Sequence, residues 1–188
     1  MGFGLIATLG AIVLIVIIII SIRNSLIGKK NKVEYANGAV DAMFKQRYDL
    51  IPNLVASVKQ YMQHESGLLE RLVQLRSQAQ QPNLSEQQRN NLNNELDHAL
   101  KTFNISVENY PNLKASEQFS RLQASLNECE GQLAAARRTY NAAVMEYNNA
   151  IEMFPSSIFA SQMGYVRKEM ITASEQEQVN PNVGNLFQ

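Results

Sequence analysis

The sequence contains no tryptophan, a single cysteine, and few of the residues that interrupt regular structure. The lone Cys129 excludes an internal disulfide and a cysteine-based metal cluster. Only 9 glycines and 5 prolines occur in 188 residues, and this scarcity favours a few long elements over many short strands. Acidic side chains are also missing from the N-terminal part, because none precedes Glu34.

The charges balance over the whole chain but not along it. There are 17 Lys and Arg against 17 Asp and Glu, so the formal net charge is zero. The residues from Glu34 onward carry 13 bases against 17 acids, which is not the basic stripe or patch of a nucleic-acid-binding domain. We therefore expect no nucleic-acid partner. The four bases before Glu34 follow the longest apolar run: Arg23, Lys29, Lys30 and Lys32.

That apolar run, Leu5 to Ile22, contains no charged side chain and predicts a transmembrane helix. Eighteen residues of helix span about 27 Å, roughly one hydrocarbon core. A cleaved signal peptide is the alternative, but it needs a basic segment before the apolar core and a small-residue cleavage site. Here the first residues carry no base, and the run leads directly into Arg23 and the lysines. The pattern favours a single-pass anchor over residues 1–27.

The basic flank and the small residues of the run predict how the anchor is used. Lys and Arg close to a span mark its cytoplasmic side, so we expect the N-terminus outside and the remaining chain in the cytoplasm. The same four bases would contact anionic lipid headgroups. Small residues early in the run, at a spacing that lets membrane helices pack closely, predict a homo-oligomer. They are Gly4, Ala7, Thr8 and Ala11.

Residues 28–172 show the apolar spacing of a helical bundle. A stripe that starts at Val33 recurs every three or four residues to Met62, and it predicts a helix that continues past Gly67 to about Ala79. The stripe consists of Val33, Ala36, Val40, Phe44, Tyr48, Ile51, Val55, Val58 and Met62, then Leu68, Leu72 and Leu75. Pro52 lies inside this helix and should kink it, and Asp49 and Asn53 could bond the backbone groups that it frees.

Three later breaks divide the remaining chain. Ser85, with Gln88 three residues on, predicts a capping box at the start of a second helix that Pro111 ends. Ser116 is expected to start a third helix that runs to Phe154, before Pro155. Ser156 and Ser157 would cap a last helix with an apolar stretch from Ile158 to Met170, and residues 173–188 form a polar tail.

The third helix carries a sustained seven-residue repeat, which predicts coiled-coil-like packing. One column is bulky and the other mostly small. An intramolecular bundle core and a dimer zipper would both produce this pattern, and the two other helices that need partners favour the core. The columns are Phe119, Leu126, Leu133, Tyr140, Tyr147, Phe154 and Leu122, Cys129, Ala136, Ala143, Ala150. The predicted fold is all-α: a single transmembrane helix followed by an elongated antiparallel helical bundle.

Two polar motifs are not fully explained by bundle formation. The first is the stretch around Pro52, and the second is a pair of aromatic–amide steps on the third helix. Both motifs could consist of polar side chains at the edge of a helix–helix contact within the bundle, or they could form a partner-binding surface. Their candidate interaction residues are Arg47, Tyr48, Asp49, Pro52, Asn53, Arg137, Arg138, Tyr140, Asn141, Tyr147 and Asn148.

The sequence contains no residue pattern typical of a catalytic or metal-binding site. His64 and His98 have no second histidine at metal-ligand spacing, and no phosphate-binding glycine loop or nucleophile elbow occurs. Cys129 falls in a core column, so a buried and inert thiol is expected. We expect a non-enzyme without a cofactor.

Taken together, these segments resemble the LemA family. The resemblance rests on residues 47–55, 108–115, 135–141, 147–148 and 154–157 with Ala160, which occur in the family's order. It implies an N-terminally anchored bacterial membrane protein with an elongated helical bundle and no catalytic residues. A related group is associated with building magnetosome membranes.

Two functional hypotheses follow. The first is a scaffold in the bacterial inner membrane that self-associates and organises or remodels that membrane. The second is an adaptor that binds another membrane protein, such as a protease or a sensor, through the polar motifs of the bundle. An enzyme is the least favoured reading, because no group of residues converges on a reactive site.

Overall fold

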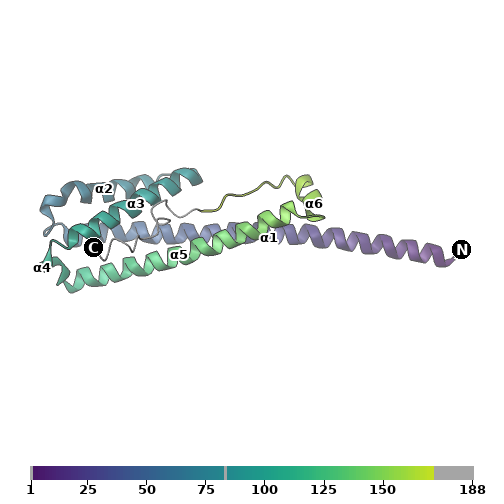
Figure 1. The fold of residues 1–188 in the computed structure, drawn as a ribbon, viewed down its shortest axis with the longest axis horizontal. Helices are drawn as coiled ribbons and strands as arrows, with labels where there is room; N and C mark the ends of the chain where they lie inside the picture. The colour runs from purple at the N-terminus through teal and green to yellow at the C-terminus, as the bar shows by residue number, and fades with distance from the viewer. Residues whose placement is uncertain (1, 83, 172–188) are drawn as a thin grey trace, which may run out of the picture. The chain divides into compact units, whose positions relative to one another are not determined.

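The computed structural model describes residues 2–82 and 84–171, and in these ranges the chain is helical without strands (Figure 1). The all-α fold predicted from the sequence is confirmed, with a long apolar N-terminal helix and bundle packing. The elements in chain order are α1 (Gly2–Val58), the 3-10 turn η1 (Gln63–Glu65), α2 (Ser66–Ala79), α3 (Glu86–Val107), α4 (Pro111–Lys114), α5 (Glu117–Glu152) and α6 (Ser156–Gln162). The predicted tail, 173–188, lies outside the described residues.

The described residues fall into two compact units. One contains residues 2–40 and 136–170, and the other contains residues 41–135 and 171. Helices α1 and α5 contribute residues to both units. We call them the anchor unit and the bundle unit.

In the anchor unit, α1 has two parts with different surroundings. The side chains of residues 6–18 and of Ile20 are exposed, and the first fully buried residue of α1 is Leu26. From there one face of the helix is buried, and its lysines contact Glu146 on α5, so the apolar run itself takes no part in the core. The buried residues of this unit are Leu26, Val33, Ala36, Val40, Tyr140, Ala143, Val144, Tyr147 and Ala160, with Asn148.

The bundle unit contains the remaining part of α1, then α2, α3, α4 and the first part of α5. The predicted stripe on α1 is buried at Phe44, Tyr48, Ile51 and Val58, while Val55 is half-buried. On α3 the apolar residues also recur every three or four positions, and Leu96, Leu100, Phe103 and Val107 are buried while Leu92 is half-buried. The rings of Phe103 and Phe119 meet with centroids 6.3 Å apart. Sequence periodicity therefore located most of this core.

The prediction that the first helix reaches Ala79 is wrong, because α1 ends at Val58. The carbonyl oxygen of Val58 accepts bonds from the backbone N–H of Tyr61 and Met62, and the side chain of Met62 is fully buried. The new helix α2 then buries Leu69, Leu72 and Leu75, whereas Leu68 is only half-buried. Turning the chain back lets α2 pack against α3, and a straight helix could not bury these leucines.

The N-terminus of α3 forms as predicted. The hydroxyl of Ser85 accepts from the backbone N–H of Gln88 at 3.2 Å, and the side chain of Gln88 accepts from the backbone N–H of Ser85 at 2.9 Å. These two bonds complete a capping box. Pro111 follows as the first residue of α4, a position where its missing N–H costs nothing.

The end of α5 differs from the prediction. The helix stops at Glu152, and Phe154 is 81% exposed, so the bulky column ends at Tyr147. The hydroxyl of Ser156 donates to the carbonyl oxygen of Met153 and does not cap α6. Helix α6 ends at Gln162, so the predicted last helix to Met170 is only partly correct. After Gly164, which has φ +67°, residues 165–170 form no helix, and Figure 1 shows them as a stretched segment. We call residues 165–170 the strap.

Candidate functional site

Arg47, from the first polar motif, lies in the core of the bundle unit with only 2% of its side chain exposed. It forms an ion pair with Asp97 of α3, and its Nε atom lies 2.6 Å from a carboxylate oxygen of Glu130 on α5. One buried guanidinium thus ties α1 to two other helices. A buried charge is tolerated only where such partners compensate it.

Tyr48, the next residue, carries two hydrogen bonds to other helices. Its hydroxyl donates to the side-chain oxygen of the buried Asn93 on α3, whose amide donates to the carbonyl oxygen of Arg89 at 2.9 Å. The Nε atom of Arg76 on α2 donates to the backbone carbonyl oxygen of Tyr48 at 3.2 Å. This is the oxygen that residue 52 would normally bond within the helix, and Pro52 has no N–H.

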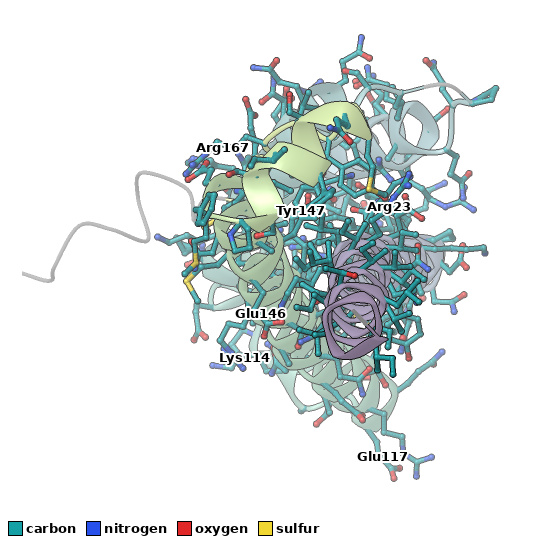
Figure 2. The ribbon with its side chains drawn as sticks, turned by 90° about the vertical axis from the view of Figure 1, so that its right-hand side faces the viewer. Arg23, Lys114, Glu117, Glu146, Tyr147 and Arg167 are labelled. Carbon is teal, nitrogen blue, oxygen red and sulfur yellow. The ribbon has the colours of Figure 1, made fainter. Side chains whose placement is uncertain are left out.

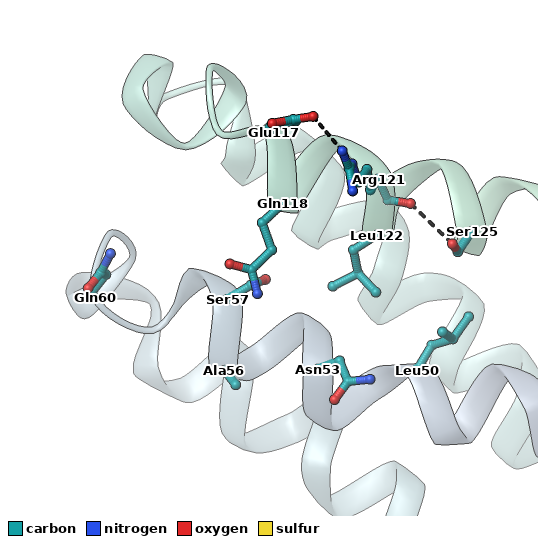
Figure 3. A pocket seen from close by; sticks show the side chains of 10 residues that line it. All are labelled: Leu50, Asn53, Ala56, Ser57, Gln60, Glu117, Gln118, Arg121, Leu122 and Ser125. Atoms are coloured by element: carbon teal, nitrogen blue, oxygen red, sulfur yellow. Dashed lines mark hydrogen bonds and ion pairs between the residues drawn. The ribbon is translucent and has the colours of Figure 1, made fainter.

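The other two residues of this motif do not serve the backbone groups freed by Pro52. Asp49 accepts from Lys45 at 2.8 Å on the helix surface. Asn53 instead lines an open pocket of about 820 Å³ between α1 and α5 within the bundle unit (Figure 3). The α1 wall consists of Leu50, Asn53, Ala56, Ser57 and Gln60, and the α5 wall of Glu117, Gln118, Arg121, Leu122 and Ser125.

In the anchor unit, α5 presents three side chains that bond the backbone of the strap. The amide of Asn148 bonds both backbone groups of Lys168: its Nδ2 donates to the carbonyl oxygen at 2.9 Å, and its Oδ1 accepts from the N–H at 3.0 Å. The hydroxyls of Tyr147 and Tyr140 donate to the carbonyl oxygens of Val166 and Glu169, at 3.2 and 3.3 Å. We call Tyr140, Tyr147 and Asn148 the tyrosine–asparagine face.

Further contacts involve the side chains of the strap. The rings of Tyr165 and Tyr147 are 5.9 Å apart, and the ammonium group of Lys30 lies 5.7 Å from the centre of the Tyr165 ring. Arg167 pairs with Glu152 near the end of α5. Figure 2 shows Tyr147 on α5 and Arg167 on the strap. Burial raises the pKa of the Tyr147 hydroxyl, and Tyr165 adds to the rise, so this hydroxyl stays a donor at neutral pH.

Most of the predicted basic flank is paired within the anchor unit. Lys32 lies 2.9 and 3.0 Å from the two carboxylate oxygens of Glu146, and Lys29 lies 4.0 Å from the same group. These contacts, led by the hydrogen bond from Lys32, hold the pKa of Glu146 below its ordinary value. Lys30 pairs with Glu34 one turn along α1 at 3.5 Å. Arg23 is exposed.

The remaining predicted residues are less buried than the tyrosine–asparagine face. Arg137 and Asn141 are half-buried, and Arg138 is exposed. Sequence reasoning missed Asn93, Asp97 and Glu130, the residues that pair with the first motif. The spacing held a signal, because Arg89, Asn93 and Asp97 recur every four residues beside the apolar stripe of α3 and therefore share its inner edge.

Groups with reactive potential are scattered. Among the described residues, no three His, Cys, Asp or Glu side chains cluster so that they could hold a metal ion. His64 and His98 are exposed, as expected for surface histidines. Cys129 is buried as predicted, with its thiol 3.7 Å from the carbonyl oxygen of Met43. Burial, with a smaller effect of Glu130, raises the pKa of this thiol, which therefore remains protonated and unreactive.

Within the described part of the chain, α1 is the helix whose length and composition would allow it to cross a membrane. Its most apolar 18-residue window has a mean hydropathy of 2.7, and 0% of that window is buried. The helix is compatible with a single-pass anchor.

Comparison with known proteins decides the family. The sequence model of the LemA family matches residues 36–184, which is most of the chain and begins after the apolar run. The chain belongs to the LemA family. A protein named LemA from Metamycoplasma hominis is 24% identical over 164 residues, which cover 87% of this chain and 75% of that protein. LemA is not a known enzyme family.

Two magnetosome proteins are similar over a shorter stretch. MamQ 1 and MamQ 2 of Paramagnetospirillum magneticum are each 33% identical to this chain over 72 residues. That stretch covers 38% of this chain and 26% of either magnetosome protein. The similarity to LemA proteins thus extends over most of the chain, and the similarity to MamQ over a shorter part of it.

Proposed function

We propose that this LemA-family protein is a membrane-anchored helical scaffold that self-associates and organises the membrane that holds it. The observation that carries the proposal is the exposed apolar part of α1. Apart from the half-buried Ile19, the isoleucines and valines from Ile6 to Ile20 are between about half and three-quarters exposed, and none of them belongs to the buried core of the described residues. Such a surface is stable in lipid, where a helix satisfies its own backbone.

A scaffold also agrees with how the polar motifs are used. Arg47, Tyr48, Tyr147 and Asn148 are buried and bonded to other parts of the chain, so they hold helices and the strap in place. The two MamQ relatives are named as magnetosome proteins, and their similarity to part of this chain agrees with a role at a membrane. The basic residues after the apolar run support a cytoplasmic location for the helical units and the inner membrane of a bacterium as the site. Exposed Arg23 would contact anionic headgroups.

The adaptor hypothesis is favoured by one observation, the pocket of Figure 3. Leu50 and Asn53 belong to the first motif but face this open, half-polar pocket. A protein partner that used the motif would bind there.

The mass of the detergent-extracted particle separates the two functions. We expect a homogeneous homo-oligomer in mild detergent and cross-linked multimers in native membranes. Ala7→Ile with Ala11→Ile, both at exposed positions of α1, should shift the assembly toward smaller species if the apolar helices pack closely. A monomer in both assays contradicts the scaffold, and a monomer that co-purifies with another protein until Asn53→Lys is introduced establishes the adaptor.

A further inference from the structure

The strap is bound mainly through its backbone. Asn148 pairs with both the N–H and the carbonyl of Lys168, as a neighbouring strand would, and two tyrosine hydroxyls bond further carbonyls. These bonds require an extended chain in the right register but do not depend on its side chains. The tyrosine–asparagine face is therefore a binding surface for extended polypeptide.

Selectivity comes from three side-chain contacts of two strap residues, and every copy of this chain carries the residues that form them. Tyr165 contacts Tyr147 and Lys30, and Arg167 pairs with Glu152. A second copy offers the same tyrosine and arginine at the same spacing. It would fit the surface as well as the chain's own strap does.

Apart from the hydrogen bonds to its backbone, the strap has few contacts that hold it in its own chain. Val166 is 72% exposed and Met170 is 43% exposed, so the strap buries little apolar surface. The Arg167–Glu152 pair is also largely exposed, and such pairs contribute little stability. Gly164, in the left-handed region at φ +67°, joins α6 to the strap and provides a position where the chain direction can change.

We propose that straps exchange between copies, so that residues 165–170 of one chain dock on the tyrosine–asparagine face of another. The occupant is a second copy because backbone pairing accepts any extended chain while Tyr165 and Arg167 match Tyr147 and Glu152. Anchoring in one membrane raises the effective concentration of neighbouring straps. The inference rests on the proposed self-association and specifies its contact.

Cross-linking between differently tagged copies tests the exchange. In a Cys129→Ala background, one tagged copy carries Glu152→Cys and the other carries Arg167→Cys. Both side chains are largely exposed, so neither change should disturb the fold, but together they remove the Arg167–Glu152 pair. Docking in this test therefore depends on the backbone bonds to the tyrosine–asparagine face and on the contacts of Tyr165. The two full-length chains are co-expressed and treated in native membranes with a short bifunctional maleimide. Exchange predicts an adduct that contains both tags.

The matched control replaces Glu152→Cys by Arg138→Cys, also exposed on α5 but about 21 Å away along the helix axis. Adduct formed by this control pair reports random collisions in the same membrane. The Glu152→Cys and Arg167→Cys pair should therefore give several-fold more two-tag adduct than the control pair. Asn148→Ala in the Glu152→Cys copy should lower the adduct several-fold, with circular dichroism confirming its helices. If the adduct does not exceed the control, exchange is wrong.

The outcomes also separate exchange from self-association. A homo-oligomer by mass without the two-tag adduct overturns exchange and leaves the scaffold intact. A monomer by mass without the adduct overturns both. An adduct between Glu152→Cys and a different protein would overturn exchange in favour of a foreign extended peptide.

Discussion

Arg76 on α2 donates to the carbonyl oxygen of Tyr48, the group that Pro52 leaves without its helical partner. Proline inside a helix usually costs a bond and about 3 kcal/mol. Here a side chain from another helix supplies the missing donor, and Pro52 stays within the continuous helix α1. Pro52 and Arg76 are therefore linked through the carbonyl oxygen of Tyr48, although they do not bond each other.

The first prediction follows from this relationship. Arg76→Met should lower the free energy of unfolding by about 1–3 kcal/mol, because it leaves a partly buried carbonyl unpaired. In a Pro52→Ala background the alanine N–H can bond that carbonyl, and the same substitution should cost much less. A double-mutant cycle by urea unfolding measures the coupling. Equal costs in the two backgrounds would show that Arg76 acts independently of Pro52.

The second prediction concerns the buried Arg47. Asp97→Asn or Glu130→Gln alone leaves one carboxylate beside the guanidinium and should have a modest effect. The double variant leaves an uncompensated buried charge, and the total loss should reach about 3–5 kcal/mol, more than the sum of the single effects. Chemical unfolding of the three variants measures this, with exposed Glu128→Gln as the control. Strict additivity would mean that the two carboxylates act separately.

The third prediction concerns pH and the anchor unit. Lys32 and Lys29 hold the pKa of Glu146 below its ordinary value. The Glu146 carboxylate therefore binds a proton less readily in the folded state than in the unfolded state. The stabilisation is complete above the ordinary glutamate pKa of about 4.3 and is lost as pH falls through the lower folded value. Glu146→Gln should therefore lower Tm at pH 7 and lose its effect at the acid end. An unchanged Tm difference across the titration would rule out this linkage.

The fourth prediction concerns the small column of α5. Ala143 is 1% exposed, so Ala143→Leu should overpack the anchor unit at a cost of about 1–3 kcal/mol. The neighbouring Ala142 is exposed, and Ala142→Leu should cost little. Thermal melts monitored by circular dichroism compare the two. Similar shifts would mean that the heptad register has been misassigned.

The fifth prediction concerns the anchor and its orientation. Leu14→Arg with Ile17→Arg should release the protein from alkali-washed membranes, because each arginine costs about 2.5–3.5 kcal/mol near the centre of a span. Tyr35→Arg, exposed on the same helix beyond the apolar run, should not. For orientation, Lys101→Cys in a Cys129→Ala background should resist an impermeant thiol reagent in intact cells. Its labelling there would reverse the proposed topology.

Local features were predictable because a few neighbouring residues decide each of them. The apolar run marks the N-terminal part of α1, and Ser85 with Gln88 forms the capping box that its spacing predicts. Periodicity likewise located the buried residues of α1, α3 and α5, since one helix face repeats every three or four residues. The same logic identified Tyr147 and Asn148 as unusual for a bundle surface.

Contacts between distant segments were decided by the tertiary structure. Nothing local ends α1 at Val58, but the turn after it lets α2 and α3 bury their leucines against each other. The pairing of Arg47 with Asp97 and Glu130 joins three helices, and the strap depends on α5 to bond its backbone groups. Sequence periodicity reports which face of a helix is apolar. Which segment covers that face, and which donor meets a freed carbonyl, depends on the whole folded chain.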